Sequence, residues 1–150
     1  MQGTSIYQMW PQHVGGKAFP DVPSHIGEAA DEAYRCLSIK AFRAAALLAR
    51  SAIEATAKEK GITKGGLAAK IEEMYQQQLV REYVKDAADE VRHLGNDMAH
   101  GDFVDPVEPE EAVEALALMD EVLEEVFQSP ARVAKARAAR LAKKQSPLVG

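Results

Sequence analysis

Residues 42–60 read FRAAALLARSAIEATAKEK, and this stretch decides the fold because its apolar residues recur on one face of a helix. The inner stripe is mostly alanine, interrupted by one aromatic residue and one isoleucine: Phe42, Ala45, Ala46, Ala49, Ile53 and Ala57. Alanine side chains are short, so another helix can approach this one closely. We predict a helix from about Ile39 to Lys60 that ends at Gly61, a glycine placed to terminate it.

Helical periodicity also occurs on both sides of this stretch. Upstream, Ser24 has the character of an N-cap residue and precedes a predicted helix that runs to about Leu37. Its inner stripe is Ile26, Ala30, Ala33 and Leu37. Downstream, a helix is predicted from the Gly65-Gly66 pair to about Gln78, with inner residues Leu67, Ile71 and Met74.

Two further helices follow. One starts near Arg81 and runs through residues 91–100, with Val84, Ala87, Val91, Leu94 and Met98 within about 80° of one another on a helical wheel. The other begins around Pro109, where glutamates in the first turn suit the helix dipole. Its inner stripe is Ala112, Leu116, Met119, Leu123 and Val126.

The composition agrees with these elements. Aromatic residues make up 6% of the 150 residues and runs of β-branched residues are nearly absent, which favours an all-α protein. The length suits one domain with tails. We predict an up-and-down bundle of four to five helices over residues 24–128, an irregular N-terminal arm over 1–23 and a basic C-terminal helical tail over 129–150.

The two tails differ in character. The arm contains three prolines and the Gly15-Gly16 pair, yet it carries large apolar residues (Ile6, Tyr7, Met9, Trp10 and Phe19). Such residues are expected to pack on the bundle or on a second subunit, and a homodimer is therefore predicted. At the other end, Ser129-Pro130 is interpreted as the cap of a separate helical segment over residues 131–144.

Charge is distributed unevenly along the chain, whose formal net charge is -5 at pH 7. Residues 105–125 hold nine acidic and no basic residues, whereas residues 131–145 hold six basic and no acidic residues. A basic helical tail either contacts phosphates, rests on an acidic helix face or is simply solvated. All three alternatives remain open at this stage.

Several classes of function find no support in the sequence. The single cysteine, Cys36, excludes an intramolecular disulfide and a multi-cysteine zinc site. No apolar run approaches the roughly 20 residues of a membrane span, and the N-terminus lacks a signal-peptide pattern. There is no G-x-S-x-G motif, P-loop or metal-ligand cluster. We therefore expect a cytoplasmic protein without cofactor, metal or membrane contact.

The stretch VRHLGNDMAH at residues 91–100 gathers basic, imidazole and amide side chains. Lys85, Asp89, His93, Asn96 and His100 fall on the helix face opposite the apolar stripe, and core packing does not explain them. Gly95 inside this helix costs about 1 kcal/mol relative to alanine. It therefore predicts either a bend of the helix or the close approach of another backbone.

These residues carry a family resemblance. The helical frame, the segment RSAIE at residues 50–54 and the segment VRHLGNDMAH at 91–100 resemble the HEPN superfamily (higher eukaryotes and prokaryotes nucleotide-binding), and within it a bacterial branch catalogued as a domain of unknown function. Many members of that superfamily are metal-independent ribonucleases of toxin-antitoxin and phage-defence systems. Their motif is an arginine, a polar residue directly after it and a histidine four to six residues after the arginine.

The resemblance places Asn96 and His100 on the polar residue and the histidine of that motif, whereas Gly95 occupies the position of the arginine. Arg92 is the nearest upstream arginine, but it lies about 12 Å from His100 along a straight helix. Arg50, with Glu54 one turn later, is the other candidate for the missing cation, as is an arginine from a partner subunit.

Two functions from different classes follow from this resemblance. The first is a binding or regulatory module for a nucleotide, RNA or protein partner in a defence or toxin-antitoxin-like system. The alternative is a metal-independent endoribonuclease that uses His100 with Arg92 or Arg50. A purely structural role is the third interpretation, in which His100 bonds helix-end carbonyls, Arg92 pairs with Asp89, and Arg50 with Glu54 forms an ordinary i, i+4 pair.

Overall fold

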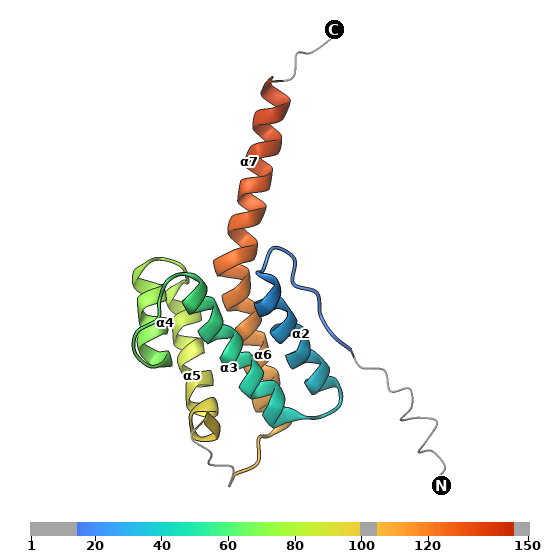
Figure 1. Cartoon of the computed structure of the whole chain (residues 1–150), viewed down its shortest axis with the longest axis vertical. Helices are drawn as coiled ribbons and strands as arrows, with labels where there is room; N and C mark the ends of the chain where they lie inside the picture. The colour runs from blue at the N-terminus through green and yellow to red at the C-terminus, as the bar shows by residue number, and fades with distance from the viewer. Residues whose placement is uncertain (1–14, 100–104, 146–150) are drawn as a thin grey trace, which may run out of the picture.

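The computed structural model describes residues 15–99 and 105–145, with the backbone alone over residues 91–99. In chain order the elements are α2 (Ser24–Ser38), α3 (Phe42–Glu59), α4 (Leu67–Gln76), α5 (Glu82–Ala99), α6 (Pro109–Leu123), the π-helical turn η1 (Glu124–Gln128) and α7 (Ser129–Gln145). Within these described ranges there is no β-strand, so the predicted all-α class is confirmed (Figure 1).

Helix α3 is the central helix of the bundle. It contacts α2, α4, α5 and α6, and Figure 1 shows it between α2 and α5. Its buried face consists largely of alanines (Ala45, Ala46, Ala49, Ala52 and Ala57), each no more than 1% exposed. Because the distance between helix axes depends on the side chains at the contact, this face allows close packing, as its sequence predicts.

Apart from Ile53 on α3, the larger side chains of the core come mainly from the surrounding helices. The predicted inner residues of α4 and α6 are all buried: Leu67, Ile71, Met74, Ala112, Leu116, Met119, Leu123 and, in η1, Val126. Helix α2 contributes Ile26, and α5 contributes Val84. Each fully buried large aliphatic residue stabilises the fold by about 1.5–3 kcal/mol, so these residues supply most of the hydrophobic stabilisation.

The helix N-termini agree with the sequence in one case and differ in another. Pro109 is the first residue of α6, as predicted, and the Glu108 N–H donates to Glu111 Oε1 at 2.9 Å. The prediction that Ser24 is an N-cap is wrong, because Ser24 is already helical and Pro23 is the N-cap residue. The carbonyl of Pro23 accepts the first bonds of α2, and no side-chain hydrogen bond caps this helix.

Three helices end in the same left-handed turn. After α3, Gly61 has φ +81°, and the N–H of Ile62 donates to the carbonyl of Ala57 at 2.9 Å, which is a Schellman motif. Equivalent hydrogen bonds end α2 and α4. There the left-handed residues are Lys40, with φ of 64°, and Gln78, with φ of 61°. Glycine predicts only the first of these, because Lys40 and Gln78 carry no sequence signal for a left-handed turn.

The chain does not break at Ser129-Pro130, and the prediction of a separate capped segment there is wrong. Helix α6 continues through η1 into α7, and the Ser129 N–H donates to the carbonyl of Glu124, five residues earlier. Pro130 has no N–H, and in an α-helix its ring meets the carbonyl of residue 126. The widened turn just before the proline lets the helical path continue, and Figure 1 shows α7 extending beyond the bundle.

Residues 15–23 contain no helix or strand, as predicted for the arm, and they lie along the bundle. Phe19 packs against the core, with its ring centroid 6.2 Å from that of Tyr34. The Gly15 N–H donates to Ser38 Oγ at 3.2 Å. Phe19 therefore packs on its own bundle, one of the two predicted alternatives, whereas the apolar residues of 1–14 lie outside the described residues.

One acidic residue of α6 connects the arm and α2. Asp120 Oδ2 accepts hydrogen bonds from Tyr34 Oη and, at 2.6 Å, from Lys17 Nζ. Burial of the Tyr34 ring, together with its hydrogen bond to the Asp120 carboxylate, raises the pKa of the Tyr34 hydroxyl, so it stays protonated and acts as a donor. Asp120 is therefore held by two donors from different parts of the chain.

Among the described residues, no helix is both long enough and apolar enough to span a membrane.

The left-handed turns lead to a prediction about stability. Gly61→Ala is expected to lower the free energy of unfolding by about 1 kcal/mol, because alanine is strained at positive φ. A Cβ atom at Gly61 meets nothing within 4 Å, so strain alone is responsible. Lys40→Gly should stabilise the protein by about 0.5 kcal/mol, and Lys40→Ala should not. Urea unfolding of the three variants measures this, and equal stability of the two Lys40 variants would contradict it.

The Tyr34–Asp120 hydrogen bond leads to a second prediction. Tyr34→Phe should lower the free energy of unfolding by about 1–2 kcal/mol, because the Asp120 carboxylate then keeps only the donor from Lys17. The matched control is Tyr83→Phe on α5, where the side chain is 64% exposed. Thermal unfolding of both variants compares them, and equal losses would mean that the hydrogen bond does not stabilise the fold.

Candidate functional site

The predicted pair of Arg50 and Glu54 lies on α3, and its two side chains interact. Arg50 Nε donates to Glu54 Oε1 at 3.3 Å. The Arg50 side chain is only 13% exposed, so this is not an ordinary surface pair. Its Nη1 atom is buried and has no hydrogen-bond partner among the described residues. A buried donor without an acceptor costs about 1–3 kcal/mol, so the position calls for an acceptor.

A third side chain completes this cluster, and the sequence did not indicate it. Lys70 on α4 places Nζ 3.6 Å from Glu54 Oε2, and its side chain is 17% exposed. One oxygen of Glu54 therefore faces Arg50 on its own helix, and the other faces Lys70 on α4. Glu54 positions Arg50 and Lys70, and the cluster of Arg50, Glu54 and Lys70 has one positive charge in excess. We call it the Arg50 cluster.

Arg43 lies seven residues before Arg50 on the same face of α3, as the spacing predicts. Its Nη2 donates to the carbonyl of Asp105 at 2.9 Å. Asp105 belongs to the connection between α5 and α6, so this bond attaches that connection to the beginning of α3. The basic face of α3 thus extends from this connection to α4.

Helix α5 carries the predicted site residues Arg92 and Asn96. It contacts α3, and its backbone is helical from Glu82 to Ala99, through Gly95. Arg92 and Asn96 lie one turn apart on this helix, about 6 Å along its axis. Their side chains, and His100 as a whole, lie outside the described residues. The structure therefore brings the helix of Arg92 and Asn96 to the helix of Arg50, without describing their side-chain contacts.

The first half of α5 corrects the predicted polar face. Lys85 and Asp89 are both partly buried, whereas they were expected on the solvent side. Lys85 Nζ lies 3.5 Å from Glu72 Oε1 on α4 and 5.4 Å from the Tyr75 ring centroid. Burial lowers the pKa of Lys85, but the carboxylates around it outweigh this effect and raise the pKa overall. This part of the polar face is turned toward α4.

The described residues do not meet the needs of a cysteine nucleophile or of a metal-ion site. Burial of the Cys36 thiol, with the nearby charge of Glu32, raises its pKa, and a protonated thiol is a weak nucleophile. Within residues 15–90 and 105–145, no three histidine, cysteine or acidic side chains are grouped to hold a metal ion. The basic side chains near the middle of the bundle are instead suited to binding anions. They are two arginines of α3 and one lysine of α4.

The fold and the Arg50 cluster define a class, a small all-α bundle with a largely buried arginine on its central helix. Residues 31–144 match the family described as Domain of unknown function (DUF4145), and the chain belongs to this family. Comparison with curated proteins and with solved structures gave no match. The matched length includes nearly all of α7, which is therefore part of what this chain shares with its family.

Proposed function

We propose that this domain is a HEPN-like module that binds the phosphate groups of a nucleotide or RNA between α3 and α5. The observation that carries the proposal is the largely buried Arg50 with a donor that lacks an acceptor among the described residues. Guanidinium groups bind phosphate oxygens through paired N–H donors. Phosphate oxygens are therefore suitable acceptors for Arg50.

Arg92 and Asn96 on α5, together with His100 after it in the sequence, supply the rest of the proposed site. By resemblance to the HEPN superfamily, Asn96 and His100 hold the positions of the polar residue and the histidine, and Gly95 replaces the arginine. Arg50 supports the proposal because it is a largely buried cation on α3, a helix that contacts α5. Arg92, one turn before Asn96, is the second source of positive charge.

A second candidate function is metal-independent RNA cleavage, and the packing of α3 against α5 is the observation that favours it. In this reaction His100 takes the proton of the 2′-hydroxyl, the 2′-oxygen attacks phosphorus, and the bond to the 5′-oxygen breaks. Arg50 or Arg92 stabilises the charge on the phosphate in the transition state. A histidine with a reference pKa near 6.5 suits the role of general base.

The proposal also includes the biological role of the domain. We infer a role in a defence or toxin-antitoxin-like system, with a homodimer as the working unit and a protein partner as regulator. These expectations rest on the resemblance to the HEPN superfamily and on the apolar arm.

Binding is tested with a fluorescently labelled single-stranded RNA and with ATP. Arg50→Met should weaken binding by about 10- to 100-fold, because a charge-assisted hydrogen bond of roughly 1.5–3 kcal/mol is lost. Stability should change by less than about 1 kcal/mol, because methionine occupies similar volume and Glu54 keeps its contact with Lys70.

The matched control for this experiment is Arg35→Met, which removes an exposed i, i+4 pair with Asp31. Arg35→Met should leave the affinity for RNA and ATP nearly unchanged. Equal affinity of wild type and Arg50→Met for both ligands would refute the proposed site. A loss of affinity that follows unfolding of the variant would assign Arg50 to stability instead.

Cleavage is tested by incubating the purified protein with RNA in excess EDTA. His100→Ala should abolish cleavage while binding persists, and Arg50→Ala should reduce the rate more than Arg92→Ala if α3 supplies the cation. Cleavage by His100→Ala at the wild-type rate would refute the catalytic site. Binding without any cleavage by wild type would support the binding module and exclude the nuclease.

A further inference from the structure

Helix α7 carries a concentrated positive charge on an open surface. It has 17 residues, none of them buried, and it extends beyond the bundle (Figure 1). Residues 132–145 are all exposed, and residues 131–145 carry six basic and no acidic side chains. The chain as a whole has a formal net charge of -5, so this positive charge is a local feature of α7.

Two of the six basic side chains attach α7 to the rest of the chain. Arg132 Nη2 donates to Glu124 Oε1 in η1 at 2.9 Å. Lys135 Nζ donates to Asp21 Oδ1 in the arm at 2.8 Å. Both pairs lie in the first two turns of the helix, so they fix how α7 is rotated relative to the bundle.

The other four basic side chains form a separate group, for which no ion-pair partner is present among the described residues. We call them the cationic face of α7, and they are Arg137, Arg140, Lys143 and Lys144. At about 100° per residue they fall within an arc of about 120°, and they extend about 10 Å along the helix axis. The helix dipole favours cations in the last turn, which accounts for the two lysines but not for the two arginines.

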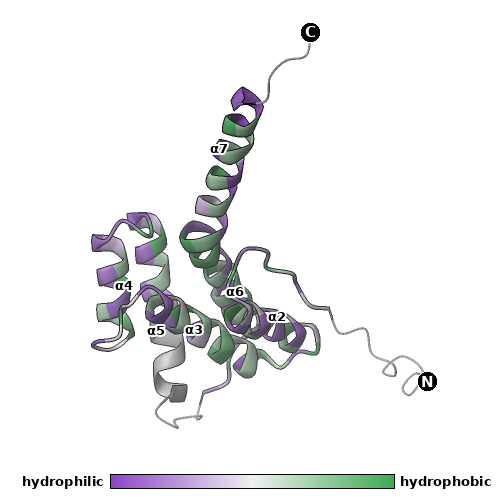
Figure 2. Cartoon of the chain, turned by 45° about the horizontal axis from the view of Figure 1, so that its top comes forward, coloured by the Kyte–Doolittle hydropathy of each residue, from purple (hydrophilic) through white to green (hydrophobic). Residues whose placement is uncertain are grey.

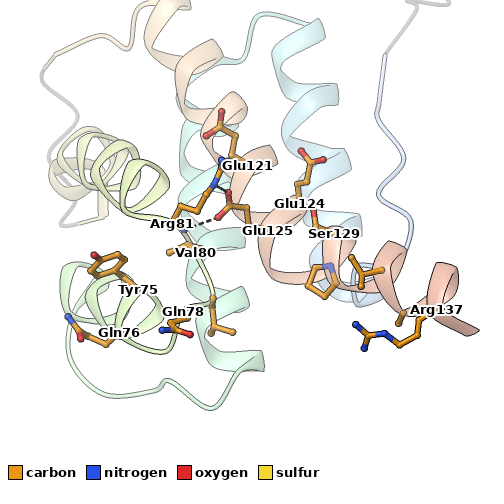
Figure 3. Close-up of a pocket in the computed structure, with 14 residues that line it drawn as sticks. Tyr75, Gln76, Gln78, Val80, Arg81, Glu121, Glu124, Glu125, Ser129 and Arg137 are labelled. Atoms are coloured by element: carbon orange, nitrogen blue, oxygen red, sulfur yellow. Dashed lines mark hydrogen bonds and ion pairs between the residues drawn. The ribbon is translucent and has the colours of Figure 1, made fainter.

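Arg137 also lines the open cleft at the base of α7, where it does not pair with the acidic side chains (Figure 3). Glu125 accepts from the backbone N–H of Arg81 at 2.8 Å, and Glu124 accepts from Arg132. Figure 3 shows the Arg137 side chain apart from both glutamates. These glutamates are therefore satisfied within the chain, and Arg137 remains available to a partner.

The apolar side chains of α7 do not form a face of their own. Val133 and Leu141 are 54% and 45% exposed, and Arg137 lies four residues from each, between them on the same side of the helix. Figure 2 shows hydrophobic and hydrophilic residues together along this helix. Membrane-surface helices keep their charges apart from an apolar face. The centres of protein interfaces are depleted of charge and rich in aromatic residues, which α7 lacks. Neither a membrane nor a protein groove suits this surface.

The phosphate backbone of a nucleic acid needs only cations. Arginine and lysine side chains bind phosphate oxygens without apolar surface around them. Proteins hold single-stranded nucleic acids with aromatic side chains that stack on the bases, and α7 contains none. A double helix presents its phosphates outward instead, about one charge per 1.7 Å of axis in B-form DNA. A face about 10 Å long therefore lies beside several phosphates at once.

We propose that the cationic face of α7 binds the phosphate backbone of a nucleic-acid duplex. Arg132 and Lys135 lie about 80° and 140° from the middle of this face, so their pairs with Glu124 and Asp21 leave it open. Contacts with phosphates carry no sequence information, so duplexes of RNA and of DNA bind this face alike. The surface is separate from the Arg50 cluster, and the inference does not rest on the proposed function.

The proposal is tested by fluorescence anisotropy of the full chain with a short labelled duplex, in RNA and in DNA form, over a range of salt concentrations. Wild type should bind both duplexes with an affinity that falls as salt rises. Arg137→Gln with Arg140→Gln should weaken binding at least about tenfold at low salt. It should also make the slope of log affinity against log salt shallower by about 2, because two phosphate contacts are lost. Glutamine is a good helix former and neither arginine is buried, so this variant keeps its fold.

The matched control is Arg132→Gln with Lys135→Gln, which changes the net charge of the same helix by the same amount. These two cations already pair with acidic residues of the chain, so this variant should keep the wild-type salt slope. Far-UV circular dichroism of both variants checks that α7 stays helical. Equal losses of affinity in the two variants would mean that net charge alone governs binding, and they would overturn the assignment of the face.

The Arg50 cluster and α7 are separated by their ligands. Arg137→Gln with Arg140→Gln should leave the affinity for ATP unchanged, because α7 contributes nothing to the proposed site between α3 and α5. In an Arg50→Met background, the same two α7 substitutions should still weaken duplex binding at least about tenfold. A failure of the proposed function and a failure of the α7 inference therefore give different results.

Three further outcomes would overturn the inference. The first is a wild type that binds neither duplex at low salt, which would make α7 a solvated helix. The second is a larger loss for single-stranded RNA than for the duplexes in Arg137→Gln with Arg140→Gln. The third is a wild type that binds vesicles of anionic lipid but no duplex, which would make α7 a membrane surface.

Discussion

Close packing against the alanine face of α3 is the constraint on which the rest of this structure depends. Because Ala45, Ala46, Ala49 and Ala52 are almost completely buried, there is no space on this face for larger side chains. The bulk of the core is therefore supplied by the neighbours of α3, from Ile26 on α2 to Met119 on α6. A central helix with small side chains contacts four other helices, and this packing determines which way their polar faces are directed.

The Arg50 cluster is a consequence of this central position. The side of α3 that carries Arg43, Arg50 and Glu54 contacts the α5–α6 connection through Arg43 and α4 through Glu54. Glu54 offsets part of the cost of enclosing Arg50 by pairing with it, and with Lys70 at its other oxygen. One buried donor of Arg50, the Nη1 group, has no hydrogen-bond acceptor among the described residues.

The π-helical turn η1 joins α6 of the bundle to the basic helix α7. It carries the path of α6 past Pro130, so that the basic C-terminal helix α7 continues from α6 and extends beyond the bundle. The same turn contributes Glu124 and Glu125 to the cleft at the base of α7. The acidic and basic blocks of the sequence thus meet at this turn, where Glu124 pairs with Arg132.

The sequence by itself determined the all-α class, most helix boundaries to within a few residues, and most of the buried residues of α2, α3, α4 and α6, because helical periodicity is a local property. It also indicated Arg50 and Glu54 through their spacing. Only the tertiary structure decided that Arg50 is largely buried, that Lys70 joins it, and that Lys85 faces α4, since these depend on which helices become neighbours. Residues 40, 78 and 124–130 were missed for a related reason. Left-handed turns without glycine and a π turn before a proline are accepted only when packing on both sides outweighs their local cost.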